Sequence, residues 1–214
     1  MPDASGTTTL AAEPAQAPAA VVAAVRAMLG ARSIVLVGMM GAGKSSIGRR
    51  LAGRLNIPFV DADAEIEKAA GMSINDIFSA HGEPYFRAGE ARVILRLLEG
   101  GPQVLATGGG AFMNDDTRAA IHAKGVSVWL RATFEVLSRR TKRRSDRPLL
   151  KSDDPQATLR RLIDERYPIY AKADLTVESR DVPHDAIVDE IVAGLRALPA
   201  LTGSAPRGSG EPNS

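Results

Sequence analysis

The chain has 214 residues, of which 44% are apolar and 24% are charged, and its formal net charge is +2. This is the composition of one folded domain with its own core, and the charge alone gives no sign of a nucleic-acid partner. The absence of cysteine excludes disulfides, zinc–thiolate sites and a thiol nucleophile. No apolar run approaches the length of a bilayer span and the N-terminus lacks a secretory start, so we expect a cytoplasmic protein.

The two ends of the chain differ from its middle. The first residues are rich in Ala, Pro and Thr, and the last are rich in Gly, Ser and Pro. Such segments bury too little apolar surface to fold alone. We predict a largely disordered N-terminal extension over 1–30, with a short helix at 19–29. One folded domain over 31–199 and a disordered tail over 200–214 complete the chain.

One stretch carries the strongest ligand signal. It runs from Gly38 to Ser45, GMMGAGKS, and fits the phosphate-binding pattern G-x-x-x-x-G-K-[ST]. An apolar run at 33–37 precedes it, as a buried parallel strand would, and apolar residues at helical spacing follow over 46–55. Glycines let successive backbone N–H groups point at one anion, and the helix start adds its positive dipole end. Lys44 suits the phosphates, and the hydroxyl of Ser45 suits a Mg²⁺ ion.

Two aspartates follow the next predicted strand, at 57–61. Asp61 and Asp63 lie two residues apart at the strand end, where ligands of parallel α/β sheets bind. Two functions are open for them: contact with the Mg²⁺ shell and a hydrogen bond to an acceptor hydroxyl. The alternative is that one of them caps a helix over 64–70. Beside a phosphate-binding loop we favour the functional interpretation.

Two helices are predicted next, a short one over 73–80 with Ser73 as its N-cap and a longer one over 83–99. The longer one carries Arg87 and Glu90, which are i,i+3 neighbours. The pair is either a surface ion pair of little consequence, or Glu90 braces Arg87 for a substrate carboxylate, which fits the planar fork of an arginine.

Three glycines at 108–110 end a predicted buried strand at 103–107. They cost chain entropy, and we expect them to present backbone N–H groups to a ligand, with a flexible turn as the alternative. A helix that starts at Asp115 or Asp116 and a strand at 126–130 follow.

A predicted helix over 133–140 leads into the most basic stretch of the chain, 139–154. A nucleic-acid patch is one interpretation, but the stretch lacks interleaved aromatic residues. A lid that closes over ATP and brings Arg147 to the transferring phosphate explains it better. Solvated surface charge is the alternative for its other cations.

The remainder is predicted as a helix at 155–167, a strand at 173–178 and a helix at 184–195. Arg166 either faces the cleft or caps the end of its helix. The histidines have no partners at metal-ligand spacing, so we assign no role to His81, His122 and His184.

Taken in order, these motifs resemble the shikimate kinase family, whose members are nucleoside-monophosphate-kinase-like P-loop enzymes. The resemblance covers residues 33–195 and rests on Gly38–Ser45, Asp61-x-Asp63, Phe86-Arg87-x-x-Glu90, Gly108–Gly110, Arg147-Pro148-Leu149-Leu150 and Arg166-x-Pro168-x-Tyr170. It implies an α/β fold of three layers, α/β/α, with a five-stranded parallel sheet in the order 2-3-1-4-5. It also implies a mobile lid at about residues 141–155.

The resemblance implies a role for each matching residue. ATP is then bound by Gly41, Ala42, Gly43, Lys44, Ser45, Ser46, Arg139, Arg147 and, at the adenine, Arg180. Shikimate is bound by Asp63, Arg87, Gly109, Gly110 and Arg166. Asp63 is the candidate base, Lys44 and Arg147 act in catalysis with it, and Ser45 and Asp61 hold one Mg²⁺ per monomer.

The implied reaction is transfer of the γ-phosphate of ATP to the 3-hydroxyl of shikimate, on the route to chorismate and the aromatic amino acids. The expected partners are these two small molecules, with no nucleic acid and no membrane, and we expect a monomer. Two alternatives stay open: a kinase for another hydroxy acid such as gluconate, and a module that binds ATP without transferring phosphate. The N-terminal extension matches nothing in the family core.

Overall fold

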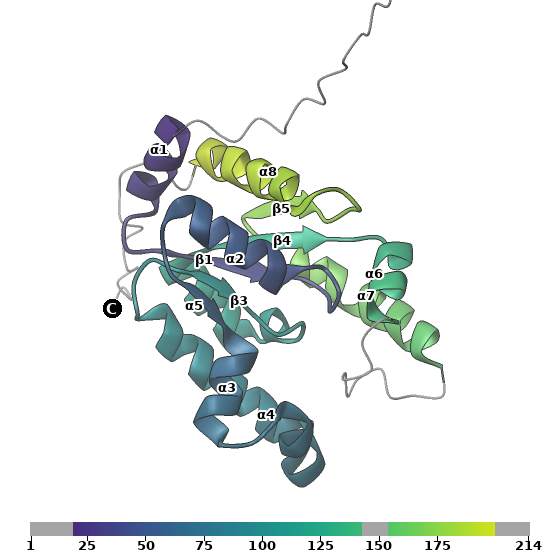
Figure 1. The fold of residues 1–214 in the computed structure, drawn as a ribbon. Helices are drawn as coiled ribbons and strands as arrows, with labels where there is room; N and C mark the ends of the chain where they lie inside the picture. Colours follow the sequence, from purple (N-terminus) through teal and green to yellow (C-terminus); the bar gives the residue numbers. More distant parts are fainter. Residues whose placement is uncertain (1–18, 143–153, 200–214) are drawn as a thin grey trace, which may run out of the picture.

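The structure is a computed structural model that describes residues 19–142 and 154–199. Its centre is a parallel sheet whose strands, β1 to β5, span Ser33–Val37, Phe59–Asp61, Val104–Ala106, Gly125–Arg131 and Leu175–Glu178. They lie in the order β2-β3-β1-β4-β5 (Figure 1). The predicted fold class and strand order are therefore confirmed.

Strand β1 lies at the centre of this order and is covered on both faces. Every residue of β1 is buried, and β1 pairs in parallel with β3 on one side and with β4 on the other. Ile34, for example, lies opposite Val104 and Val126. A continuous apolar run is what a parallel strand needs when helices cover both faces of its sheet.

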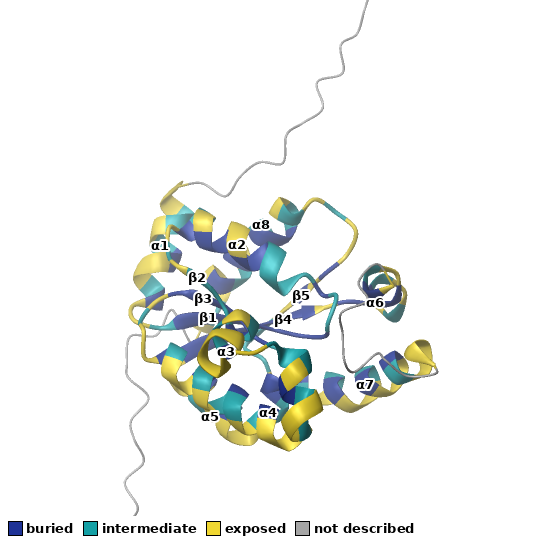
Figure 2. Cartoon of the chain, turned by 60° about the horizontal axis from the view of Figure 1, so that its bottom comes forward, coloured by how far each residue is buried: buried dark blue, intermediate teal, exposed yellow. Residues whose placement is uncertain are grey.

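Helices cover both faces of this sheet. They are α1 (Ala19–Leu29), α2 (Lys44–Leu55), α3 (Ala62–Ala70), α4 (Ile74–Leu98), α5 (Asp115–Lys124), α6 (Phe134–Thr141), α7 (Pro155–Tyr170) and α8 (His184–Ala197), with a 3-10 turn, η1, at Ala111–Met113. Helices α1, α2 and α8 contact one another on one face, and α5 contacts α4 and β4 on the other. Their inward sides are buried and their outward sides exposed (Figure 2).

The break predicted between helices over 73–80 and 83–99 is confirmed. Both helices lie within one element, α4, but Gly82 between them has non-helical φ and ψ values of 79° and 173°. The predicted cap is confirmed, because the side chain of Ser73 accepts from the backbone N–H of Asp76. Helix α7 runs past Pro168 to Tyr170, beyond its predicted end at residue 167. The Tyr170 side chain is fully buried, and its packing outweighs the one hydrogen bond that a proline removes from a helix.

The predicted short helix at 19–29 is present as α1. Its residues Val25 and Leu29 are 0% and 2% exposed and belong to the main hydrophobic core. Helix α1 packs on α8 and on α2. The folded unit therefore includes a segment that the sequence assigned to an extension, because an apolar helix face gains free energy by covering apolar neighbours.

Candidate active site

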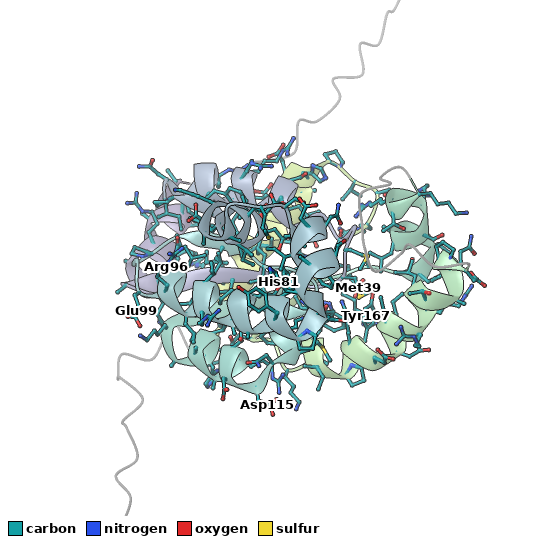
Figure 3. All side chains as sticks on the ribbon, turned by 90° about the horizontal axis from the view of Figure 1, so that it is seen from below. Met39, His81, Arg96, Glu99, Asp115 and Tyr167 are labelled. Atoms are coloured by element: carbon teal, nitrogen blue, oxygen red, sulfur yellow. The ribbon has the colours of Figure 1, made fainter. Side chains whose placement is uncertain are left out.

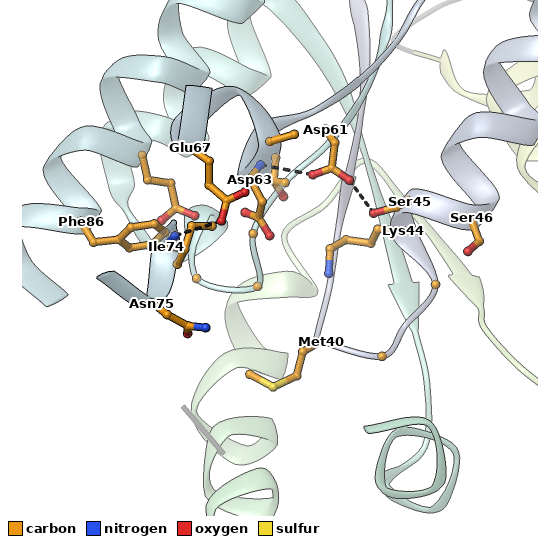
Figure 4. A pocket seen from close by; sticks show the side chains of 18 of the residues that line it. Met40, Lys44, Ser45, Ser46, Asp61, Asp63, Glu67, Ile74, Asn75 and Phe86 are labelled. Carbon is orange, nitrogen blue, oxygen red and sulfur yellow. Dashed lines mark hydrogen bonds between the residues drawn. The ribbon is translucent and has the colours of Figure 1, made fainter. Parts of the chain in front are cut away.

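A large cavity lies beyond the carboxyl ends of the strands. It measures about 840 Å³, within the range of small-molecule sites. Figure 4 shows Lys44 and Ser45 at one end of the cavity, Phe86 at the other, and Asp61 and Asp63 between them. A donor end and an acceptor end can be described separately.

The donor end is the glycine-rich loop before α2. Gly38, Gly41 and Gly43 adopt φ values of 135°, 84° and 91°, which favour glycine over any residue with a side chain. At Gly38 a side chain would also meet the carbonyl oxygen of Leu130 at 2.7 Å. The predicted turn between a strand and a helix is confirmed, and α2 points its N-terminus at the cavity.

Two side chains of the loop point into this end. The Nζ of Lys44 donates to the carbonyl oxygens of Gly38 and Met39, at 2.7 and 3.0 Å. The hydroxyl of Ser45 donates to Oδ2 of Asp61 at 2.7 Å. The predicted proximity of Ser45 and Asp61 is thus present in the structure.

Asp61 has two functions in the structure. Its Oδ1 accepts from the backbone N–H of Asp63 at 3.2 Å and caps α3, while its Oδ2 accepts from Ser45. Asp61 therefore caps the helix, as one interpretation predicted, and also lies in the cleft, as the other predicted. A hydroxyl and a carboxylate are the oxygen ligands that Mg²⁺ prefers, with phosphates and waters completing its shell. Among the described residues no group of three or more His, Cys, Asp or Glu is arranged to hold a metal.

The acceptor end is built around the glycines at 108–110. A side chain at Gly108 would meet Oε1 of Glu90 at 2.4 Å and Oδ1 of Asp63 at 3.0 Å. A side chain at Gly110 would meet Cζ of Arg87 at 2.4 Å, and one at Gly109 would meet Nη1 of Arg166 at 3.3 Å. The glycines are therefore needed for space: they let charged side chains lie directly on the backbone.

Arg87 is held by two carboxylates. Its Nη1 donates to Glu90 at 2.7 Å, and its Nε and Nη2 donate to Glu83 at 3.1 and 2.9 Å. Burial lowers the pKa of Arg87, but the two carboxylates together raise it above its ordinary value. Burial is also the main reason that the pKa of Glu90 is raised, against the opposite effect of Arg87. The predicted pairing of Glu90 with Arg87 is confirmed, and both residues line the cavity.

Arg166 lies inside α7 and is 6% exposed. Its Nη1 donates to the carbonyl oxygen of Gly109 at 3.1 Å, and the hydroxyl of Tyr170 donates to the same oxygen. Burial raises the pKa of Tyr170 to about 12, so this hydroxyl stays a donor at neutral pH. Arg166 lines the cavity and therefore faces the cleft, which decides between the two predicted positions.

The comparisons with known proteins agree with this geometry. The model of the shikimate kinase family matches residues 40–196. A shikimate kinase from Bradyrhizobium diazoefficiens is 67% identical over 79% of this chain and 82% of its own. One from Rhodopseudomonas palustris is 64% identical over 81% and 85%. The chain belongs to the shikimate kinase family.

The family also has structural relatives. The structure of a shikimate kinase from Acinetobacter baumannii in complex with shikimate has a TM-score of 0.75 and 37% identity, covering 78% of this chain and 94% of that one. A gluconokinase from Sinorhizobium meliloti covers 77% of this chain and 91% of its own with a TM-score of 0.50, but it is only 22% identical. The second likeness shows the fold alone. The family prediction, and with it an ATP-using kinase, is confirmed.

The structure places none of the three arginines predicted for ATP in the described lining of the cavity. Arg147 lies outside the described residues, as does the stretch 143–153, which includes most of the predicted lid. Arg139 pairs with Asp181, and Arg180 pairs with Glu190. Among the described residues, the cavity lining includes neither Arg139 nor Arg180. Their contacts with ATP stay predictions.

The structure adds two residues to the donor end of this shikimate kinase family site. Arg140 lines the cavity and donates to the carbonyl oxygen of Gly41 at 3.3 Å and to Oγ of Ser179 at 2.9 Å. His184, at the start of α8, lines the same end. Burial, and then the charges of Arg50 and Arg140, lower its pKa. Sequence reasoning missed both, because a histidine without a metal partner and one arginine among several carry no local signal.

The two other histidines lie outside this site, as predicted. His81 packs against the ring of Tyr85, and His122 lies 3.8 Å from Asp174. Trp129 packs edge-on against Tyr167. In the part of the chain that the structure describes, no helix combines the length and apolar character that crossing a bilayer requires.

Proposed function

We propose that the chain transfers the γ-phosphate of ATP to the 3-hydroxyl of shikimate, giving ADP and shikimate 3-phosphate. One observation carries this proposal: the glycine-rich loop and the two arginines that lie against Gly109 and Gly110 line one cavity, with Asp63 between them. The loop suits a nucleoside triphosphate, and two guanidinium groups suit one carboxylate. The family membership and the relative crystallised with shikimate support it.

The donor residues act by charge and alignment. The backbone N–H groups of residues 41–46 bind the phosphates of ATP at the positive end of α2, and Lys44 leaves its carbonyl partners for the β- and γ-phosphates. Arg140 and His184 border the nucleoside end. Ser45 and Asp61 hold a Mg²⁺ ion, which neutralises phosphate charge when it is bound.

The acceptor residues fix the hydroxyl that reacts. Arg87 and Arg166 bind the carboxylate of shikimate, and the backbone of Gly109 and Gly110 contacts its ring substituents. Asp63 accepts the proton of the 3-hydroxyl as its oxygen bonds to the γ-phosphorus. The bond from that phosphorus to the bridging oxygen of ADP breaks in the same transfer, so atoms and charge balance.

A closing segment completes the proposal. Arg147 is proposed to reach the transferring phosphate from the lid, and Arg139 to support it. Exclusion of water by a lid favours transfer to shikimate over hydrolysis of ATP. We further propose a cytoplasmic monomer that binds no nucleic acid and acts on the route to chorismate.

Release of ADP separates this function from its alternatives. The full chain is assayed in a coupled ADP-release reaction with ATP and Mg²⁺, and with shikimate, gluconate or no acceptor. We expect shikimate alone to stimulate ADP release. Stimulation by gluconate would favour the other hydroxy acid, and release that does not depend on any acceptor would contradict the proposed transfer. Omitting Mg²⁺ tests the metal proposal in the same assay.

A further inference from the structure

A second hollow lies between α3 and α4, behind the acceptor end. It measures about 310 Å³, the lower end of the range for small-molecule sites. Apolar side chains form most of its wall, among them Ile66 from α3 and Ile77, Tyr85 and Val93 from α4. Phe86 lines both this groove and the main cavity.

One residue of the groove is a glycine although the packing around it does not require one. Gly89 lies within the long second half of α4, where glycine stabilises a helix less than alanine does. No atom lies within 4 Å of the position that its Cβ would occupy. Gly48 in α2 contrasts with it, because a Cβ there would meet the ring of Phe59 at 2.7 Å. The missing side chain of Gly89 leaves room in the groove that the described residues do not fill.

Two arginines border the same groove. Arg92 and Arg96 are one helical turn apart on α4 and therefore lie on one face. Within the described residues the guanidinium of Arg92 has no hydrogen-bond or ion-pair partner, and Arg96 is paired with Glu65 at 3.8 Å, with 61% of its side chain exposed. In Figure 3, Arg96 lies near the end of α4 that is farther from His81. These two guanidinium groups, one without a described partner and one in a long ion pair, lie at the rim of an apolar groove and suit a carboxylate ligand.

We propose that this groove is a binding site for a small molecule with an apolar body and a carboxylate. The apolar body fills the space beside Gly89, and the carboxylate binds Arg92 and Arg96. A second copy of the chain fits less well, because Met72, Tyr85 and Leu95 are the exposed large apolar residues of the described part, and of these Tyr85 alone lines the groove. A stable dimer interface buries far more surface than they offer.

The groove is connected to the acceptor end by one side chain. Phe86 is 5% exposed, and Cζ of Arg87 lies 5.0 Å from the centroid of its ring. A ligand that presses on the far side of this ring acts on the arginine proposed to bind the shikimate carboxylate. Occupation of the groove therefore changes the affinity for the acceptor. This coupling rests on the proposed function, whereas binding in the groove does not.

Binding is tested with benzoate and cyclohexanecarboxylate, and with benzyl alcohol as a probe without charge, by titrating the full chain in calorimetry and NMR. We expect the two acids to bind and the alcohol to bind about tenfold more weakly. The double substitution of Arg92→Gln and Arg96→Gln should weaken the binding of both acids about tenfold. Equal binding of acid and alcohol would overturn the proposal.

The arginines of the acceptor end are a competing site for a carboxylate. Binding of benzoate in the groove persists in Arg87→Ala and in the presence of saturating shikimate. Loss of binding in Arg87→Ala, with full binding in the double variant of Arg92 and Arg96, would place the probe in the main cavity and overturn the proposal.

Gly89→Ala gives a test that misfolding cannot imitate. The substitution should raise the melting temperature, because alanine stabilises a helix, and yet weaken binding of benzoate by filling the space for the ligand. Gly53→Ala is the matched control: it also lies in a helix with open space around its Cβ position, and it should raise the melting temperature without changing binding. Unchanged binding in Gly89→Ala would overturn the proposal.

Coupling is measured as the effect of a saturating groove ligand on steady-state kinetics. We expect the KM for shikimate to change about fivefold and the KM for ATP to stay the same. Binding without any change in KM would overturn the coupling through Phe86 but leave the groove site in place. Failure of the proposed kinase function would instead appear as absence of shikimate-dependent ADP release without any ligand.

Discussion

The donor end and the acceptor end of the cavity both depend on glycines, for different physical reasons. In the donor loop, Gly38, Gly41 and Gly43 have positive φ values that disfavour other residues. In the acceptor end, Gly108 and Gly110 are required because Glu90 and Arg87 occupy the space of their side chains. The first requirement is local to one stretch of chain, and the second exists only after distant helices have packed.

This difference predicts which substrate each end controls. The donor loop is one continuous segment beside a buried strand, so a change there should act on ATP. The acceptor end joins residues from α3, α4, the loop after β3, and α7, so a change there should act on shikimate. Four measurements test this division, from the largest expected effect to the smallest, and a fifth tests the buried support of the acceptor end.

Lys44→Ala should have the largest effect. It removes the charge that binds the β- and γ-phosphates, and we expect kcat to fall about a thousandfold or more. Circular dichroism and the melting temperature should show a folded protein, because Lys44 is only partly buried and lies outside the hydrophobic core. Full activity would exclude the loop from the reaction.

Arg87→Ala should separate the two ends. The loss of a charged hydrogen-bonding fork should raise the KM for shikimate about tenfold to a hundredfold and change the KM for ATP little. Steady-state kinetics with each substrate varied in turn give both values. An equal rise of the two KM values would contradict the assignment of Arg87 to the acceptor.

Gly110→Ala tests the space argument without removing any charge. The new Cβ would lie 2.4 Å from Cζ of Arg87, so the guanidinium must move, and we expect a rise of about tenfold in the KM for shikimate. Gly43→Ala is the comparison in the donor loop, where a φ of 91° disfavours alanine. It should raise the KM for ATP instead. If both variants affect the same substrate, the two ends are not separate.

Arg140→Ala and Arg139→Ala test the donor end more finely. Both arginines pair with Asp181, but Arg140 also contacts the carbonyl oxygen of Gly41 and lines the cavity. We expect the first substitution to raise the KM for ATP several-fold, about threefold to tenfold, and the second to raise it less. A larger effect at Arg139 would support the original prediction for that residue.

Tyr170→Phe tests the buried support of the acceptor end through pH. The folded pKa of Tyr170 is about 12, above the ordinary 10, so between pH 10 and 12 the unfolded chain releases a proton that the folded chain keeps. Stability is therefore present below pH 10 and is lost as pH rises, by about 1.4 kcal/mol per pH unit. Denaturant unfolding from pH 8 to 11.5 should show a shallower decline in Tyr170→Phe. Equal slopes would contradict the raised pKa.

The sequence by itself determined the elements that depend on neighbouring residues. Local residue types are enough to predict a buried strand at 33–37, the glycine-rich turn after it and a helix that begins close to Lys44. The ordered motifs predicted the family, the parallel sheet and its strand order. They also predicted that Arg87 pairs with Glu90, since i,i+3 spacing on a helix brings them together.

Only the tertiary structure decided the contacts between distant segments. It placed Arg166 against the carbonyl of Gly109 and inside a helix, where the sequence left two positions open. It joined α1 to the core, because the neighbouring surfaces of α8 and α2 give that apolar face something to cover. Arg139 and Arg140 both pair with Asp181, but only the structure shows that Arg140 also contacts Gly41 and lines the cavity, whereas Arg139 is absent from its described lining. Side chains one residue apart on a helix face different directions, and only the packing of α6 decides which of them meets the phosphate loop.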